Sequence, residues 1–329
     1  MRIKYPRLVA DIGGTNARFS LETSPFKHEQ TKVLACKDYK NLVEAADAYL
    51  HSAGLDHVEY AGIALPTPIV GDEIYMVNNP WRSFSIEQTK KQLKLKNIVF
   101  LNDFHALALS IPHLNKSTDL FQIGGLEIDE YKPRGIIGPG TGLGIATLVR
   151  HPNGEYLAVP AEGGHSTFTP TNLEEMELWQ FVHRRFSHVS FERFVSGPGL
   201  QLIFEAVSYQ KRFQFEHLPS PAEITQRAIN RECWISQLTL DHFCRMLGTI
   251  ASNLAITTNA FGGIYIGGGV VPKIIDYFKQ SDFRCRFEDK GRLRKYLEKI
   301  PSYVITHEFP AFLGVSHALE TLITKKYLP

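Results

Sequence analysis

Three glycine-rich turns are the first residues of this chain whose type and spacing could do chemistry. They lie at residues 11–16, 138–144 and 267–269 and read DIGGTN, GPGTGLG and GGG. Glycine has no Cβ, so backbone N–H groups in such turns can crowd around an anion, and the hydroxyls of Thr15 and Thr141 can add donors. Each segment alone is equally compatible with an ordinary tight turn. None spells a Walker A loop or a complete G-x-G-x-x-G dinucleotide fingerprint.

An acidic residue, Asp11, leads the first turn at the end of a predicted strand. Its carboxylate would repel a phosphate bound there unless a cation lay between the two. The pattern therefore predicts Mg²⁺, which usually keeps waters and binds through one or two carboxylates and phosphate oxygens.

A second acidic residue, Asp103, follows a short apolar run and precedes a helix-like segment. Asp is a preferred helix N-cap, which gives it a purely structural interpretation. The functional interpretation is a general base at the end of a strand that takes a proton from a hydroxyl. The residue types alone leave both open.

A third constellation combines Glu162, His165 and the later Glu192. Glu162 and His165 could chelate a metal, but no third ligand is spaced nearby, so a metal site is the weaker interpretation. Together the three side chains offer donors and acceptors suited to a polyol. A site that hydrogen-bonds each hydroxyl of its substrate rejects analogues that lack one.

Alternating and helical apolar patterns predict the elements that carry these residues. A capping-box spelling at 220–223 begins one helix, because Ser and Glu stand three residues apart around a Pro at the first helical position. We expect strands at 58–65, 97–101 and 264–266, a strand–turn–strand unit at 136–150, helices at 104–111, 234–260 and 311–327, and a connector at 112–135. Strands mixed with helices favour an α/β or α+β class.

Composition narrows the classes of partner. The 329 residues predict two domains, and 36 Lys and Arg against 34 Asp and Glu favour neither nucleic acid nor an anionic membrane. The basic positions 90–96 are interpreted as a solvated helix face. Four widely spaced cysteines fit reduced thiols in a cytoplasm. The uncharged stretch 246–272 is interrupted by polar residues and glycines, so it is not predicted to span a membrane.

Taken together and in order, these motifs resemble the bacterial glucokinases, members of the sugar kinase, actin and heat-shock-70 ATPase superfamily. The likeness covers essentially the whole chain, and the absence of a cysteine-rich zinc loop points to the zinc-free group. The motifs that carry it are DIGGTNAR at 11–18, LNDF at 101–104, residues 138–144, EGGH at 162–165, ER at 192–193 with SGPG at 196–199, GGGVVP at 267–272 and FEDKGR at 287–292.

The resemblance implies an α/β, two-domain actin-like ATPase (ribonuclease H-like) fold with a central cleft. The small domain would comprise residues 1–111 plus 310–329, and the large domain 112–309. The implied activity is ATP-dependent, Mg²⁺-assisted phosphorylation of D-glucose on its 6-hydroxyl, with Asp103 as the base. A homodimer is compatible, because the family is often dimeric.

The resemblance also implies the site residues by matching position. Glucose would contact Asn102, Asp103, Glu162, His165 and Glu192. Metal would be aligned by Asp11, directly or through water. ATP would be held by Asp11, Gly13, Gly14, Thr15, Gly140, Thr141, Gly142, Gly267, Gly268 and Gly269.

Three other functions are compatible with parts of the pattern. A kinase for mannose, fructose or an amino sugar would carry the same motifs. An ATPase of the actin or chaperone type would need no cluster that reads hydroxyls. A sugar-responsive transcription regulator would carry a DNA-binding domain before the phosphate loop, which here begins at residue 11.

Overall fold

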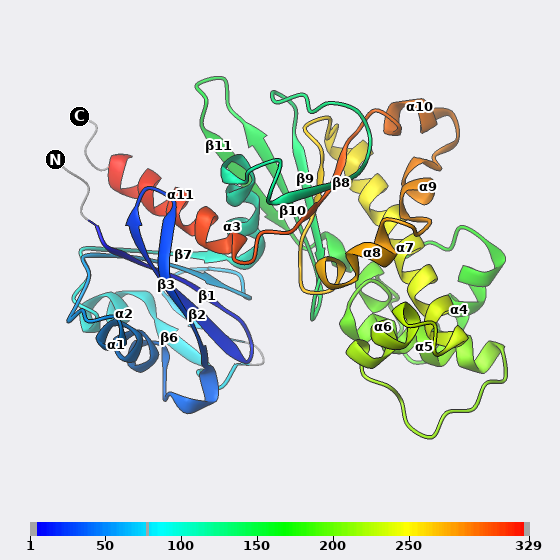
Figure 1. Ribbon diagram of the computed structural model, residues 1–329, viewed down its shortest axis with the longest axis horizontal. Helices are drawn as coiled ribbons and strands as arrows, with labels where there is room; N and C mark the ends of the chain where they lie inside the picture. The colour runs from blue at the N-terminus through cyan, green and yellow to red at the C-terminus, as the bar shows by residue number, and fades with distance from the viewer. Residues whose placement is uncertain (1–4, 77–78, 326–329) are drawn as a thin grey trace. The chain divides into compact units, whose positions relative to one another are not determined.

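The computed structural model describes residues 5–76 and 79–325, and the chain divides into two compact units (Figure 1). Unit 1 is Met1–Asn115 together with His307–Pro329, and unit 2 is Lys116–Thr306. Each unit contains a mixed sheet with its own helices.

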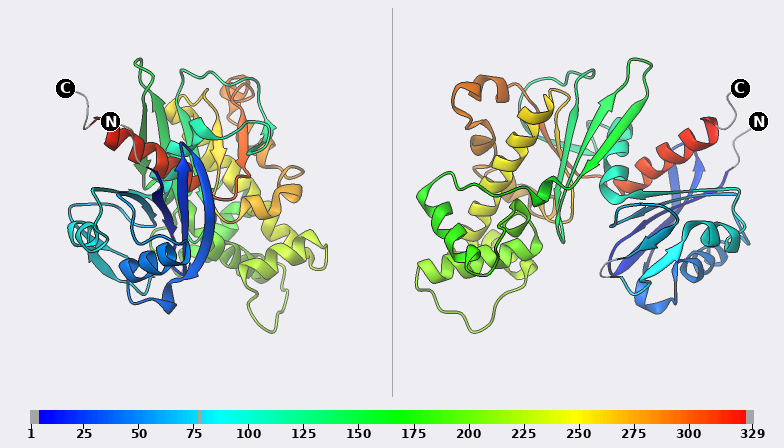
Figure 2. Two further views of the ribbon diagram at one scale, coloured as in Figure 1. Left: turned by 60° about the vertical axis from the view of Figure 1, so that its left-hand side comes forward. Right: turned by 180° about the vertical axis from the view of Figure 1, so that it is seen from behind.

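Unit 1 is built on a five-stranded sheet in the order β3-β2-β1-β4-β7. The first three strands form antiparallel pairs, whereas β1, β4 and β7 run parallel. Helices α1 and α2 cover one face and α3 and α11 the other (Figure 2). The elements are β1 (Arg7–Ile12), β2 (Asn16–Ser24), β3 (Lys27–Ala35), α1 (Leu42–Ser52), β4 (Tyr60–Leu65), the small ribbon β5 (Glu73–Tyr75) and β6 (Ser83–Ser85), α2 (Ile86–Gln92), β7 (Asn97–Asn102), α3 (Asp103–Ser110) and α11 (Pro310–Lys325).

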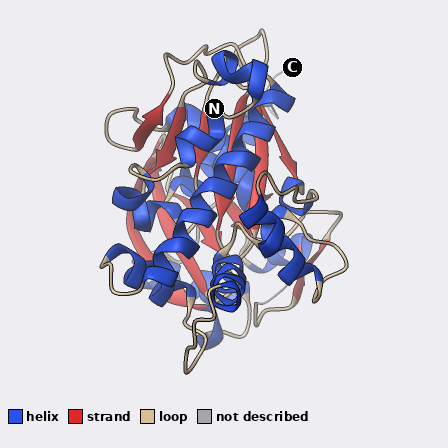
Figure 3. Ribbon diagram, turned by 90° about the vertical axis from the view of Figure 1, so that its right-hand side faces the viewer, coloured by secondary structure: helices blue, strands red, loops and turns tan. Residues whose placement is uncertain are grey.

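Unit 2 is built on a six-stranded sheet in the order β11-β10-β9-β12-β13-β8. Its helices lie over this sheet (Figure 3), and the long helix α7 packs against α5, α6 and α9 in one large apolar core. The elements are β8 (Leu120–Gly124), β9 (Arg134–Pro139), β10 (Leu143–Arg150), β11 (Tyr156–Ala161), α4 (Leu173–His183), α5 (Gly197–Gln210), α6 (Pro221–Ile229), α7 (Trp234–Thr258), β12 (Ile264–Ile266), α8 (Ile275–Phe278), α9 (Phe283–Glu288), α10 (Arg294–Leu297) and β13 (Ser302–Ile305).

Five strands of each sheet repeat one topology. In each unit an antiparallel hairpin is extended by a third antiparallel strand, and two parallel strands follow on the other side of the hairpin's first strand. Strand β8, which precedes the hairpin of unit 2, is an additional strand at the edge next to β13. The first hairpin of unit 1 turns at residues 13–15, and that of unit 2 turns at residues 140–142. Two glycine-rich turns singled out in the sequence therefore occupy equivalent places.

Most of the predicted elements are confirmed. The strand–turn–strand unit is β9 and β10, the long helix is α7, and Ser220 and Glu223 form the predicted capping box of α6. The prediction of a plain connector at 112–135 is wrong, because residues 120–124 form β8 and pair antiparallel with β13. The prolines and glycines of this stretch favoured a connector, although β8 reads LFQIG and contains three apolar residues. The last helix begins at Pro310, and the predicted end at 327 lies outside the described residues.

Helix α11 packs into unit 1 through glycines. Gly314 lies on the backbone carbonyl of Ala106 in α3, and Gly62 of β4 lies against the Val315 side chain. This close approach holds α3, whose first residue is Asp103.

Replacing Gly314 with Ala should therefore destabilise the protein by about 1–3 kcal/mol, because the new Cβ overpacks the contact with a backbone that cannot move aside. Thermal unfolding measures the effect. Gly269→Ala is the matched control, since a Cβ there meets open space. Equal unfolding midpoints for the two variants would contradict the packing argument.

Candidate active site

Two predicted site segments of unit 1 follow neighbouring parallel strands. Asp11 pairs in register with Ala64 of β4, and Ala64 pairs with Leu101 of β7. Because parallel strands end at the same edge of a sheet, Asp11 and the Asn102–Asp103 pair lie along one edge.

The helix N-cap at this edge is Asn102, not Asp103. The Asn102 Oδ1 accepts the N–H groups of Phe104 at 2.9 Å and His105 at 3.3 Å. Asp103 is the first helical residue, and its Oδ1 accepts the Phe104 N–H at 2.8 Å. The capping interpretation therefore belongs to the neighbour, and the Asp103 carboxylate is available for chemistry.

The surroundings of Asp103 raise its pKa to about 6. Burial of the carboxylate is the main cause, and the negative charge of Asp11 adds to it, while the hydrogen bond from Phe104 N–H opposes it. A carboxyl with this pKa is largely ionised at neutral pH and is a stronger base than an ordinary aspartate.

Asp11 forms an ion pair across the first hairpin. Its Oδ2 accepts Arg18 Nη1 at 3.1 Å, because the two residues are direct cross-strand partners in β1 and β2. Burial raises the pKa of Asp11, and Arg18 opposes that rise. Nowhere in the described chain do three or more His, Cys, Asp or Glu side chains gather as a metal site. A single carboxylate beside a phosphate turn fits Mg²⁺ held chiefly by phosphate oxygens and water.

The first glycine turn has one backbone hydrogen bond within it and accepts another from a side chain outside it. Gly13 N–H donates to Asn16 O at 2.8 Å, and the Gly13 carbonyl accepts Asn79 Nδ2 at 2.8 Å. Among the described residues, nothing accepts the N–H groups of Gly14 and Thr15. Two adjacent backbone donors at a turn are an anion-binding arrangement.

The second turn has the same plan. Gly140 N–H closes the turn on Gly142 O at 2.8 Å, and Gly140 O accepts Gly197 N–H at 2.8 Å from the start of α5. Pro139 has no N–H. Within the described ranges, the N–H groups of Thr141 and Gly142 have no acceptor, so this turn also presents two adjacent donors.

The third turn packs against the second. Gly268 has φ +79°, a conformation that favours glycine, and a Cβ there would collide with the Pro139 carbonyl. Gly267 N–H donates to Ile137 O at 2.9 Å, which fixes the end of β12 beside that of β9.

In unit 2 the structure brings two of the three predicted hydroxyl-reading side chains, His165 and Glu192, close together. Glu162 and His165 are exposed at the end of β11, where the Glu162 carbonyl accepts His165 N–H at 3.0 Å. Glu192 Oε1 lies 3.8 Å from His165 Nε2. Glu192 is half-buried on a single 3₁₀ turn, Phe191–Arg193.

The structure thus places the predicted residues in two groups. Unit 1 contains Asp11, Gly13, Gly14, Thr15, Asn102 and Asp103. Unit 2 contains Gly140, Thr141, Gly142, Glu162, His165, Glu192, Gly267, Gly268 and Gly269.

Arg18 and Asn79 form hydrogen bonds with predicted site residues, but neither was predicted to do so. Arg18 could have been inferred from its position, because a hairpin that turns at 13–15 sets residue 18 opposite residue 11. The contact of Asn79 with Gly13 had no such signal. It is 66 residues from Gly13 in sequence, and only the fold brings its amide there.

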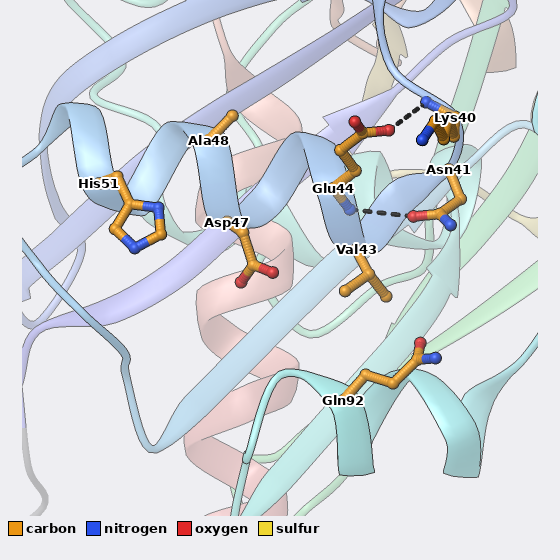
Figure 4. A pocket seen from close by; sticks show the side chains of 8 residues that line it. All are labelled: Lys40, Asn41, Val43, Glu44, Asp47, Ala48, His51 and Gln92. Carbon is orange, nitrogen blue, oxygen red and sulfur yellow. Dashed lines mark hydrogen bonds between the residues drawn. The ribbon is translucent and has the colours of Figure 1, made fainter.

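A separate hollow of about 630 Å³ lies between α1 and α2 (Figure 4). Two of its polar side chains serve the α1 cap: Asn41 Oδ1 accepts Glu44 N–H at 2.9 Å, and Glu44 Oε2 accepts Lys40 N–H at 2.6 Å. None of the predicted site residues lines it.

The fold and its paired glycine turns define the class. A solved glucokinase from an Antarctic psychrotroph has a TM-score of 0.86 and 31% identity, with 96% of this chain and 99% of that chain covered. A ROK family glucokinase from Streptomyces griseus, solved with glucose and AMPPNP, shares the fold with a TM-score of 0.65 at 18% identity, covering 96% of this chain and 100% of that one. The chain has the mixed α/β fold of the actin-like ATPases.

Sequence comparison narrows the class to one family. A family model described as Glucokinase matches residues 8–322. The glucokinase of Neisseria gonorrhoeae is 48% identical over 315 residues, which covers 96% of this chain and 95% of the relative. This chain belongs to the glucokinase family.

Asn79→Asp should weaken the first turn, because an ionised carboxylate cannot donate to Gly13 O and Asn79 is only 6% exposed. We expect a loss of about 1–3 kcal/mol in unfolding free energy, with faster hydrogen exchange of the Gly13 and Cys36 amides, which donate to Asn16 O and Thr15 O. Asn41→Asp is the control, since Asn41 acts through its oxygen alone in the α1 cap. Unchanged exchange of these two amides would show that Asn79 does not hold the turn.

Proposed function

We propose that this protein transfers the γ-phosphoryl group of ATP to the 6-hydroxyl of D-glucose, giving glucose 6-phosphate and ADP, with Asp103 as the general base. The observation that carries the proposal is the Asp103 carboxylate, which lies at the edge of the sheet beside the first phosphate turn, is not the helix cap, and has a pKa of about 6. As the sugar oxygen attacks phosphorus, Asp103 accepts its proton.

The two hairpin turns hold phosphates through paired backbone donors. Gly14 and Thr15 supply them in unit 1, and Thr141 and Gly142 in unit 2, while Gly13 and Gly140 close the turns. The Gly267–Gly269 turn lies against the second hairpin and receives the nucleoside. Phosphoryl transfer has a loose transition state, so charge neutralisation and alignment provide most of the catalysis.

Sugar hydroxyls are read by Asn102, Asp103, Glu162, His165 and Glu192. The side chains from unit 2 fix the far side of the ring, and this aims the 6-hydroxyl at the nucleotide.

Asp11 is the residue that would align Mg²⁺, directly or through water, and Arg18 fixes the orientation of its carboxylate. The ion would neutralise phosphate charge. The names of relatives support glucose as the substrate: solved glucokinases from Streptomyces griseus and Balamuthia mandrillaris contain glucose, and the former also contains AMPPNP. A kinase for another hexose is the alternative.

The setting we propose is the cytoplasm, with the reaction feeding glycolysis, and without a nucleic-acid or membrane partner. All four cysteines are free. Among residues 5–76 and 79–325, no helix has both the length and the apolar character of a membrane span. A homodimer is part of this proposal.

Asp103→Asn tests the base directly. Asn cannot accept the proton, so kcat should fall about 10²–10⁴-fold, whereas glucose affinity should change little because the amide still hydrogen-bonds. A coupled assay for glucose 6-phosphate, run across a panel of hexoses, measures turnover and also tests the alternative substrate. The unfolding midpoint is the control for folding, and wild-type turnover would remove Asp103 from the mechanism.

The pH profile gives a second test. The enzyme is active only when Asp103 is ionised. Its kcat/KM should therefore be level above about pH 6 and fall about tenfold per pH unit below it. The residual activity of Asp103→Asn provides the control, because it should lack this step. A wild-type profile that stays level down to pH 5 would contradict the assignment.

A further inference from the structure

One carboxylate in unit 2 touches both the second phosphate turn and the sugar-reading cluster. Glu192 Oε2 accepts the Leu143 N–H at 2.8 Å, and Leu143 is the residue that follows the turn and begins β10. The other oxygen, Oε1, lies 3.8 Å from His165 Nε2. No other described side chain that we assign to the sugar has a hydrogen bond to a phosphate turn.

The same carboxylate also sets the shape of the turn. A Cβ built on Gly142 would lie 2.6 Å from Glu192 Oε2, so the side chain fills the space beside this residue. Gly164, next to His165, lies directly on the Leu143 carbonyl. Leu143 is therefore held at its N–H by Glu192 and at its carbonyl by the segment that carries His165.

These contacts decide which donors the turn presents. Because Glu192 takes the Leu143 N–H and Gly142 O takes the Gly140 N–H, the turn offers an anion the N–H groups of Thr141 and Gly142. Without the Glu192 contact, the start of β10 would lose the restraint that aims these two groups.

We propose that Glu192 is a positioning residue for the phosphate turn, and that it couples sugar binding to nucleotide binding. The proposal rests on the function proposed above and extends it. A sugar hydroxyl that donates to Glu192 restrains the carboxylate, and the restrained carboxylate holds the turn. Linkage then requires that bound nucleotide strengthen sugar binding by the same factor, typically about 5–150-fold in coupled sites.

The test measures affinity for Mg²⁺–AMPPNP by titration calorimetry, first without sugar and then with saturating glucose, which should raise the affinity of wild type about 5–150-fold and that of Glu192→Asp less. Glu192→Asp keeps the charge but shortens the side chain, so the contact with Leu143 N–H is lost and affinity should fall about tenfold or more. Glu192→Gln keeps the length of the side chain and one acceptor oxygen, so the affinity of this variant for AMPPNP should stay within a few-fold of wild type. Glu162→Gln changes a residue that we assign to the sugar and that has no hydrogen bond to the turn. Its affinity for AMPPNP without sugar should equal that of wild type.

A second pair of variants separates positioning from a general folding defect. Gly142→Ala should weaken AMPPNP binding through its clash with Glu192, and Glu192→Asp should relieve that clash. The double variant Gly142→Ala, Glu192→Asp should therefore lose less than the two single losses combined. Thermal melts confirm that each variant is folded.

Two results would overturn the proposal. One is wild-type AMPPNP affinity in sugar-free Glu192→Asp, which is what a residue that only binds sugar would give. The other is simple additivity in the Gly142 pair. Failure of the proposed function is a separate outcome, since it would be seen as wild-type protein that makes no glucose 6-phosphate.

Discussion

A turn that binds phosphate must leave backbone N–H groups without an internal acceptor, against the strong tendency of such groups to pair. Both hairpin turns of this protein meet that requirement in the same way. The first glycine closes the turn on a nearby carbonyl, and the next two N–H groups stay unpaired. An open turn of this kind is held by few bonds of its own, so neighbouring side chains must hold it.

Each unit supplies that support from a different part of the chain. In unit 1 the buried amide of Asn79 donates to Gly13, and in unit 2 the carboxylate of Glu192 accepts from Leu143. An amide suits a carbonyl and a carboxylate suits an N–H, so the chemistry of each support follows from the group that it holds. The shared sheet topology explains why the turns match.

Local patterns were enough to predict much of the fold. Glycine turns, the capping box at Ser220 and the apolar face of α7 each depend on residues close together in sequence. The glucokinase family membership was also predictable, because several ordered motifs span the chain. Strand β8 was not, since its short run LFQIG lies among prolines and glycines and its partner β13 is distant in sequence. The supports Asn79 and Glu192 act over 66 and 49 residues of sequence, and no spacing rule reports such contacts.

The division of labour at Asn102 and Asp103 shows why two adjacent polar residues are needed where a helix follows a strand end. The first turn of α3 has N–H groups that require acceptors. The carboxylate of an aspartate at the cap position would accept hydrogen bonds from them. Asn102 satisfies two of these groups with its amide oxygen. Asp103 accepts one N–H and is otherwise held in a poorly solvated place near the negative charge of Asp11, and both effects raise its proton affinity. Had Asp103 been the cap, the extra N–H contacts would have stabilised its ionised form and lowered its pKa, making it a weaker base. The neutral cap therefore leaves the charged neighbour with a higher proton affinity than a capping aspartate would have, as the proposed general base requires.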